Sequence, residues 1–203
     1  MRTGGDPQNV LSLLLIEAFN KITQLMEGFY RNTEDGLFEI AYASEDGSQR
    51  QKIVELMREL RLQRDHLIKS FDDQLVGGLD EWLGGSDGNG YPEEHQLATH
   101  IAQRCASHFS FVLQSIAERM AHAAGRTADR NVMPVSPQQI SYHFIVSCRS
   151  IQLEPNEAKI VEDLFHRFVL DRLGGVYGSI NQKLIEAGYL TLEDREEFSV
   201  STA

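Results

Sequence analysis

The chain has little of what extracellular or membrane-spanning proteins need. Only two cysteines, Cys105 and Cys148, occur in 203 residues, whereas a disulfide framework requires more, so we expect two reduced, packed thiols. The early apolar run "LLLI" is far too short to cross a bilayer, and "MRTGGDPQN" before it lacks the features of a signal peptide. These absences favour a cytoplasmic protein with no membrane partner.

Positive charge is also scarce. Nineteen lysines and arginines face 30 aspartates and glutamates, which gives a formal net charge of −11. Nucleic-acid binding depends on lysine and arginine displacing counterions from phosphates, and unpaired carboxylates oppose it. The charge balance therefore argues against nucleic acid as the main partner.

No strand pattern occurs, and apolar residues recur at intervals of three and four, which predicts helices. We expect an all-α fold, an antiparallel bundle of about five helices, with residues 1–203 forming one domain. A helical hairpin over 7–83 comes first. Its first helix opens at Asp6-Pro7 and has either a kink or a break at 32–36. Its second helix opens near Ser48 and is interrupted at Gly77 and Gly78.

A glycine-rich loop over 84–91, "GGSDGNGY", separates the hairpin from helices over 92–187. One of these runs from Pro92 to Gly125, and the next begins at a capping box formed by Ser136 and Gln139. The last begins near Pro155 and reaches Ala187, with a possible kink at 174–175. Gly188 then suits a left-handed closing position with Tyr189 folding back, and 191–203 is a flexible tail.

The stretch "MRELRLQRD" raises the question of an anion-binding stripe. At roughly 100° per residue, Arg58, Arg61 and Arg64 fan across about a third of the helix circumference and do not form one stripe. Arg58 and Arg61 resemble ordinary surface or interface charges, and Arg61 is spaced for a pair with Asp65.

Arg64 differs because it falls on the apolar face of the second helix. A guanidinium there must extend to solvent, pair with a carboxylate or meet a ligand. We favour a structural pair with Asp35 or Glu39 over a ligand contact. Arg172 raises the same question among the apolar residues of the last helix, and we prefer two separate salt bridges to one shared anionic ligand.

Motifs for chemistry are weak. "DGNGY" resembles the middle of a calcium loop, but that alignment puts Gly85 and Gln96 where end carboxylates are needed. His100, His108 and Cys105 do not have zinc-site spacing. No nucleophile elbow or serine–histidine–aspartate set stands out. We therefore expect no metal, no cofactor, no catalytic residue and no enzyme activity.

Two stretches carry a family resemblance. "EDGLFEIA" followed by "MRELRLQRDHLIKSF" resembles the opening region of an uncharacterised proteobacterial family, domain of unknown function 1631. "VSPQQI" and "LFHRFVLDRLGGVYGSINQKLIEAGYL" resemble that family's next block, in the same order. Family members are usually much longer, so the resemblance implies that this chain corresponds to their amino-terminal part. No residue in these motifs has a chemical role to carry over.

These observations favour a bacterial, non-enzymatic regulatory or adaptor module that binds another protein or its own copy. The first helix supports this because its apolar stripe is wider than one neighbouring helix covers. The alternative is a sensor of a small anionic ligand or nucleotide, with Arg58, Arg61, Arg64 and Arg172 around it.

Overall fold

A computed structural model describes residues 7–85 and 92–189. Every regular element in these ranges is helical and none is a strand, which confirms the all-α prediction. The elements are α1 (Pro7–Ala43), α2 (Gly47–Leu83), α3 (Pro92–His108), α4 (Ser110–Ala124), α5 (Pro137–Ser147), the 3-10 turn η1 (Cys148–Ser150), α6 (Pro155–Phe168), the 3-10 turn η2 (Leu170–Arg172) and α7 (Gly174–Glu186). The expected number of about five helices is too low, because two of the expected helices are each divided.

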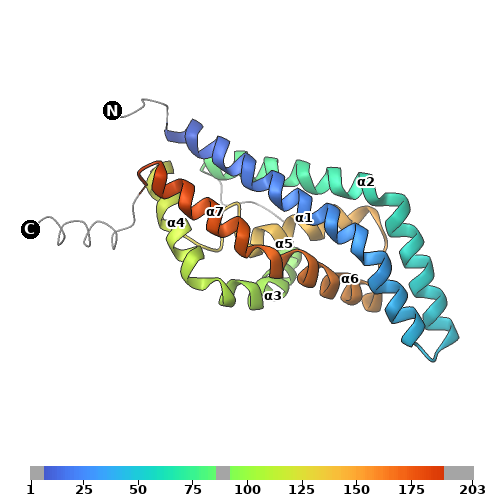
Figure 1. Ribbon diagram of the computed structural model, residues 1–203. Helices are drawn as coiled ribbons and strands as arrows, with labels where there is room; N and C mark the ends of the chain where they lie inside the picture. Colours follow the sequence, from blue (N-terminus) through green and yellow to red (C-terminus); the bar gives the residue numbers. More distant parts are fainter. Residues whose placement is uncertain (1–6, 86–91, 190–203) are drawn as a thin grey trace, which may run out of the picture.

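Helices α1 and α2 run side by side and form the longest part of the molecule (Figure 1). Helix α1 begins at Pro7, as predicted, and it continues to Ala43, so the break expected as one alternative at 32–36 is wrong, while the kink stays a prediction. The polar side chains there bond back to their own helix. Asn32 Nδ2 donates to Gly28 O at 2.6 Å, and Thr33 Oγ1 donates to Phe29 O at 2.8 Å. These residues therefore satisfy local acceptors without ending the helix.

The start of α2 is fixed by Asp46, whose carboxylate accepts from Ser48 N at 2.8 Å. The expected interruption at Gly77 and Gly78 is wrong, since α2 continues to Leu83. Gly78 instead allows α5 to approach closely. A Cβ atom built there would lie 2.7 Å from Nε2 of the buried His143 side chain, closer than side chains tolerate. The absence of a side chain at Gly78 therefore allows close packing of two helices, although glycine in a sequence is usually taken as a sign that a helix ends.

The expected helix over 92–125 is wrong because it bends sharply at Phe109 into α3 and α4, a corner visible in Figure 1. The ring of Phe109 packs edge-on against Tyr177 of α7, with centroids 5.4 Å apart. It also covers Gly174, where a Cβ atom would lie 3.1 Å from Phe109 Cε1. The residue at the corner between α3 and α4 is thus the one whose ring packs on the start of α7.

Helix α5 begins at Ser136 as predicted, with Ser136 Oγ accepting from Gln139 N at 3.0 Å. The reciprocal half of the expected capping box is wrong. The Ser136 amide donates to Met133 O at 2.8 Å in place of the Gln139 side chain. The Ser136 hydroxyl also donates to Asn131 O at 2.8 Å, so this residue ties the preceding loop to the helix.

The expected continuous helix over 155–187 is divided into α6, η2 and α7. The division lies a few residues before the predicted kink at 174–175: α6 ends at Phe168 and the 3-10 turn begins at Leu170. Gly188 adopts the predicted left-handed conformation, with φ of 85°. Tyr189 packs against the core and its amide donates to Leu184 O at 2.9 Å, which confirms the predicted close of the last helix.

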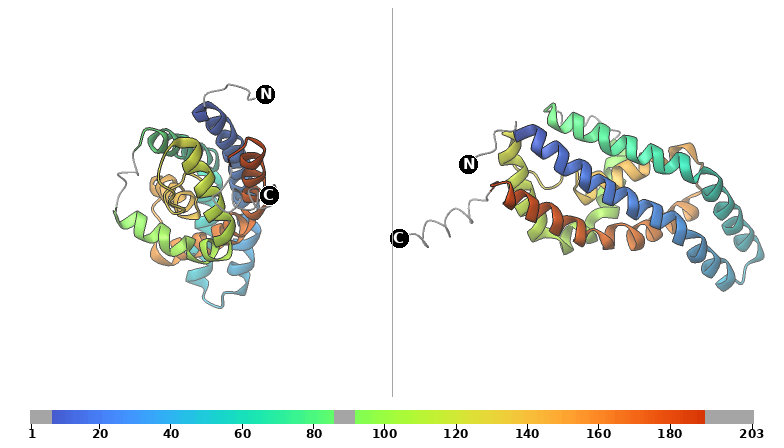
Figure 2. Two further views of the ribbon diagram at one scale, coloured as in Figure 1. Left: turned by 90° about the vertical axis from the view of Figure 1, so that its left-hand side faces the viewer. Right: turned by 45° about the horizontal axis from the view of Figure 1, so that its top comes forward.

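The core lies between the hairpin and the remaining helices. Seen from the end of the molecule, α5 lies between α2 and α3 (Figure 2), and α1 also contacts α6 and α7. Phe144 of α5 and Phe165 of α6 stack with centroids 3.9 Å apart, and Phe29 of α1 meets both rings edge-on. Aromatic packing therefore joins three helices at the centre.

Both cysteines are free thiols, as predicted, with Cys105 buried and Cys148 half-buried. Burial raises the pKa of each thiol to about 12. None of the helices that the structure describes is long and apolar enough to cross a membrane. Most of the glycine-rich loop and the whole tail over 191–203 lie outside the described residues.

Candidate functional site

The arginines of α2 divide between different environments. Arg61 forms a bidentate pair with Glu34 of α1, at 2.7 Å from Nε and 2.7 Å from Nη2, so the predicted pair with Asp65 is replaced by one across the hairpin. The Arg61 guanidinium lowers the pKa of Glu34. Arg58 is exposed. These two residues lie on the outside of the hairpin.

Arg64 does not form the predicted pair with Asp35 or Glu39. It is half-buried, and its Nε atom is buried with no hydrogen-bond partner among the described residues. Glu34 is the carboxylate whose pKa it helps to lower, at longer range than Arg61. The Glu34 carboxylate therefore interacts electrostatically with both Arg61 and Arg64.

Arg172 is exposed, which corrects its predicted place on the apolar face of the last helix. The reason is the 3-10 turn η2, which changes the angular position of each residue relative to a continuous α-helix. η2 packs against α3, α6 and α7. The structure thus does not gather Arg172 with the arginines of α2 around one pocket.

The outer face of the hairpin carries exposed apolar side chains near its turn. Phe38 and Tyr42 are 64% and 83% exposed, and their rings stack with centroids 6.5 Å apart. The bonds from Arg61 to Glu34 and from Arg50 Nε to Ala41 O set the register of the two helices. In this register Val54, 48% exposed, falls opposite Phe38. We call Phe38, Tyr42, Val54 and Arg58 the hairpin patch.

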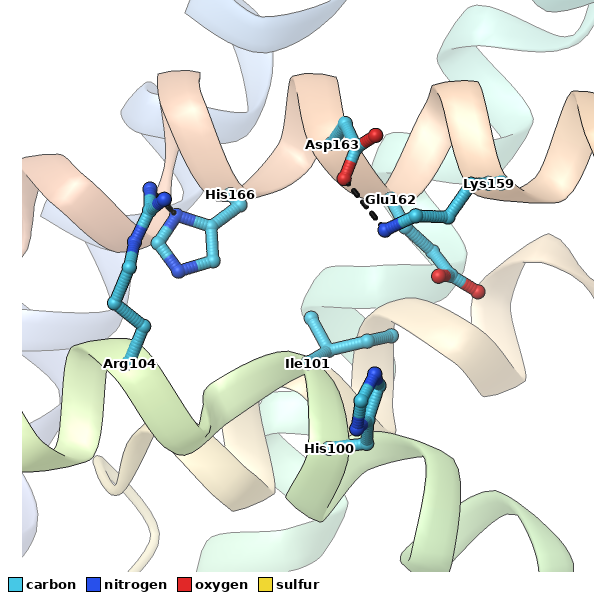
Figure 3. A pocket seen from close by; sticks show the side chains of 7 residues that line it. All are labelled: His100, Ile101, Arg104, Lys159, Glu162, Asp163 and His166. Atoms are coloured by element: carbon cyan, nitrogen blue, oxygen red, sulfur yellow. Dashed lines mark hydrogen bonds and ion pairs between the residues drawn. The ribbon is translucent and has the colours of Figure 1, made fainter.

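A second candidate site is a polar hollow of about 200 Å³ between α3 and α6. Figure 3 shows His100, Ile101 and Arg104 on α3 facing four side chains of α6 across the gap. The residues from α6 are Lys159, Glu162, Asp163 and His166. Each helix contributes its residues at intervals of three and four, so they share one face.

Charged groups at one end of the polar hollow are bound to one another. Arg104 Nη2 lies 2.7 Å from His166 Nδ1 and 3.0 Å from Asp171 Oδ2 of η2. His166 Nδ1 also lies 3.2 Å from Asp171 Oδ1. If Arg104 donates to Nδ1, the proton of neutral His166 is on Nε2, which is buried without a hydrogen-bond partner in the described part of the chain. This end of the hollow is therefore a linked arginine–histidine–aspartate group.

Glu162 lies at the other end and is bonded to no described residue. Lys159 donates to Asp163 at 2.7 Å, on the neighbouring position of α6. Partial burial is the main cause that raises the pKa of Glu162, while Lys159 and His100 oppose the shift. Its carboxylate is thus a partly desolvated anion facing open space.

Glu162 also lines an adjoining apolar hollow of about 200 Å³. The residues around it come from α3, α5, η1, α6 and the loop between η1 and α6, and the apolar ones include Leu97, Phe144, Ile145, Ile151, Leu153, Ala158 and Val161. The two hollows share Glu162 in their linings, and we call the pair of hollows the α3–α6 cleft. Sequence reasoning missed it. The spacing of charged residues indicates a polar face on each of the two helices, but the sequence does not show that these two faces meet.

No set of three or more potential metal ligands gathers in the parts of the chain that the structure describes. The stretch "DGNGY", residues 87–91, lies outside those parts.

A family model described as the N-terminal domain of a protein of unknown function, DUF1631, matches residues 7–188. The chain belongs to the DUF1631 family. The match covers the stretches that carry the resemblance in the sequence, apart from the last two residues of the second one, and it extends over the intervening helices, including α3. The search of curated proteins and the search of solved structures each found no match. The match thus identifies the family over residues 7–188, and its description gives no function.

Proposed function

We propose that this DUF1631 domain is a non-enzymatic bacterial regulatory or adaptor module of the cytoplasm that binds another protein through the hairpin patch. The antiparallel bundle expected from the sequence is the scaffold in this proposal. Its role is to hold the α1–α2 hairpin rigid while the outer face of the hairpin meets the partner.

The observation that carries the proposal is the exposed, stacked pair of Phe38 and Tyr42. Two large aromatic side chains that remain in water, one turn apart on a rigid helix, lose little conformational freedom when a partner covers them. Arg58 lies in the same register, and arginine and aromatic residues are the side chains that contribute most at protein interfaces. Together they favour a binding surface of small area with an aromatic centre.

The charge around the patch indicates the chemistry of the partner. Asp35, Glu39, Glu55 and Glu59 lie within one or two helical turns of Phe38 or Val54, and all four are exposed. A second copy of the chain would bring the same carboxylates and another net charge of −11, which repels. A basic amphipathic helix would place apolar residues on Phe38 and Tyr42 and lysines or arginines beside the carboxylates. We therefore favour such a segment of another protein over self-association.

The experiment uses two fluorescently labelled synthetic helices of equal length, one of leucine and lysine and one of leucine and glutamate. Anisotropy titration of the chain should show binding of the leucine–lysine peptide only. The double variant Phe38→Ser, Tyr42→Ser should weaken that binding about tenfold or more, the effect expected for aromatic anchors. Phe111→Ser is the matched control, because Phe111 is 79% exposed but lies on α4.

Two results would contradict the proposal. The first is equal loss of binding in the Phe111→Ser control, which would indicate general attraction to an acidic protein. The second is a dimer in light scattering that the double variant converts to a monomer, which would assign the hairpin patch to self-association.

The competing function, a sensor of an anionic ligand held by Arg58, Arg61 and Arg64, has weaker support. Arg61 is already bidentate to Glu34, and the two hollows of the α3–α6 cleft are lined by other residues.

A further inference from the structure

The α3–α6 cleft combines three different chemical surfaces in one place. Its polar hollow presents donors from His100, Arg104 and Lys159. Its apolar hollow is lined mainly by aliphatic side chains. Glu162 lies at the junction, because it lines both hollows. A single bound molecule could therefore meet a cationic group, an anionic group and an apolar surface in that order.

The Glu162 carboxylate at the junction has no hydrogen bond or ion pair to a described residue, although Lys159 and His100 attract it at longer range. Lys159 is bonded to Asp163 and Arg104 to Asp171, and Arg149, which lines the apolar hollow, is bonded to Glu94. Each of these cations therefore has a carboxylate partner other than Glu162. Figure 3 shows the Glu162 side chain extending from α6 toward α3. A carboxylate that is partly removed from water and unpaired gains most from a cationic ligand, because pairing offsets its lost hydration. This position thus favours an ammonium group.

The polar hollow retains free donors on the α3 side. Arg104 makes its bonds to His166 and Asp171 through Nη2 alone, so Nε and Nη1 make no other bond within the described chain. Its side chain is 73% exposed. His100, one turn earlier on α3, is also exposed. These groups can receive a carboxylate without breaking the arginine–histidine–aspartate group.

The apolar hollow favours a hydrocarbon side chain. Val161 is 1% exposed at its base, whereas Leu97 is 38% exposed at its edge. Covering this surface removes apolar area from water at roughly 25 cal/mol per Å². The two hollows, each of about 200 Å³, together fall in the lower part of the range typical of small-molecule sites, about 300–1,000 Å³.

We propose that the α3–α6 cleft binds a free apolar α-amino acid. The side chain of the ligand occupies the apolar hollow, its ammonium group pairs with Glu162, and its carboxylate accepts from Arg104 and His100. The site is separate from the hairpin patch, so the two proposals stand or fall independently. Such a site would make the domain responsive to the supply of amino acids.

The experiment measures thermal stabilisation and calorimetric binding with the whole chain and four probes. L-Phenylalanine and L-leucine have all three features of the proposed ligand. L-Phenylalaninamide lacks the carboxylate, and 3-phenylpropionate lacks the ammonium group. We expect both amino acids to raise the melting temperature at millimolar concentration, and each truncated probe to bind about tenfold more weakly or worse, as the loss of one charge-assisted bond implies.

Variants locate the binding. Glu162→Gln should weaken the binding of L-phenylalanine about tenfold or more. The matched control Glu59→Gln, on the exposed face of α2, should leave the affinity for L-phenylalanine unchanged. Ala158→Leu, which fills the apolar hollow, should also weaken binding. Circular dichroism and the melting temperature without ligand verify that each variant is folded.

Three results would overturn the proposal. One is the absence of stabilisation by either amino acid. Another is equal binding of the amide or of 3-phenylpropionate, because the cleft would then not recognise both charges. The third is unchanged affinity in the folded Glu162→Gln variant.

Discussion

Substitution of Gly78 by alanine tests the close contact between α2 and α5. Alanine in a helix interior is favoured over glycine by about 1 kcal/mol, so helix propensity alone predicts a gain in stability. The structure predicts the opposite sign. The new Cβ atom would lie 2.7 Å from Nε2 and 2.8 Å from Cε1 of His143, where ordinary contacts begin at 3.4 Å.

His143 has little room to move away, because its side chain is buried, with 5% exposure. Overpacking of this kind costs about 1–3 kcal/mol. The net result expected for Gly78→Ala is a loss of up to about 2 kcal/mol in the free energy of unfolding. For a chain of this length that lowers the melting temperature by up to roughly 8 °C.

The neighbouring glycine provides the control. Gly77 is exposed and has nothing within 4 Å of a built Cβ atom, so Gly77→Ala should stabilise the protein by about 0.5–1 kcal/mol. Urea denaturation of both variants measures the difference. A third variant, His143→Ala with Gly78→Ala, should recover the gain from helix propensity relative to His143→Ala alone. If Gly77→Ala and Gly78→Ala stabilise equally, the close approach of α5 to α2 is refuted.

Three further predictions concern buried polar groups. Burial lowers the pKa of His143 to about 4, so the unfolded chain binds a proton below its ordinary pKa of 6.5 while the folded chain does not. The free energy of unfolding should therefore fall by about 2 kcal/mol between pH 7 and pH 5, and this fall should be absent in the His143→Leu variant. Urea denaturation of both proteins at each pH measures it. Ser136→Ala loses the cap of α5 and the bond to Asn131, and should cost about 1–2 kcal/mol in the same assay, whereas Ser110→Ala should cost less because no side chain caps α4. The Cys105 thiol, with its pKa raised to about 12, should react with iodoacetamide slowly in the native protein and rapidly in urea; rapid native labelling would contradict its burial.

Helix content and most helix starts could be predicted from local signals. Proline at the first position of α1, α3, α5 and α6, and the hydroxyl of Ser136, act within a few residues, and the structure places them as the sequence indicates. The left-handed Gly188 is of the same kind. These features depend on the chain immediately around them, so a reader of the sequence can find them.

The divisions and continuities of the helices could not be predicted in the same way. Gly36 and Gly78 look like breaks but lie inside continuous helices, where they make room for Leu164 and His143. Phe109 looks like a core residue in mid-helix but lies at the corner between α3 and α4. In each case the deciding contact comes from a helix far away in the sequence.

The candidate sites show the same limit. Arg61 has a suitable partner four residues away, yet its carboxylate is Glu34 across the hairpin. The prediction that Arg172 lies on an apolar face assumes an unbroken helix, and the turn η2 places this residue in solvent. The α3–α6 cleft depends on two helices that are separated by α4 and α5 in the chain. Local spacing identifies which residues share a face, but not which faces meet.

The glycine contacts also bear on how the domain can move. Gly36, Gly78 and Gly174 each receive one side chain, from α6, α5 and α3–α4 respectively. Sliding α5 along α2 by a single turn would bring the imidazole ring against Gln74 or Trp82, where no gap is available for it. The side chains on either side of Gly78 thereby oppose a shear motion of α5 along α2.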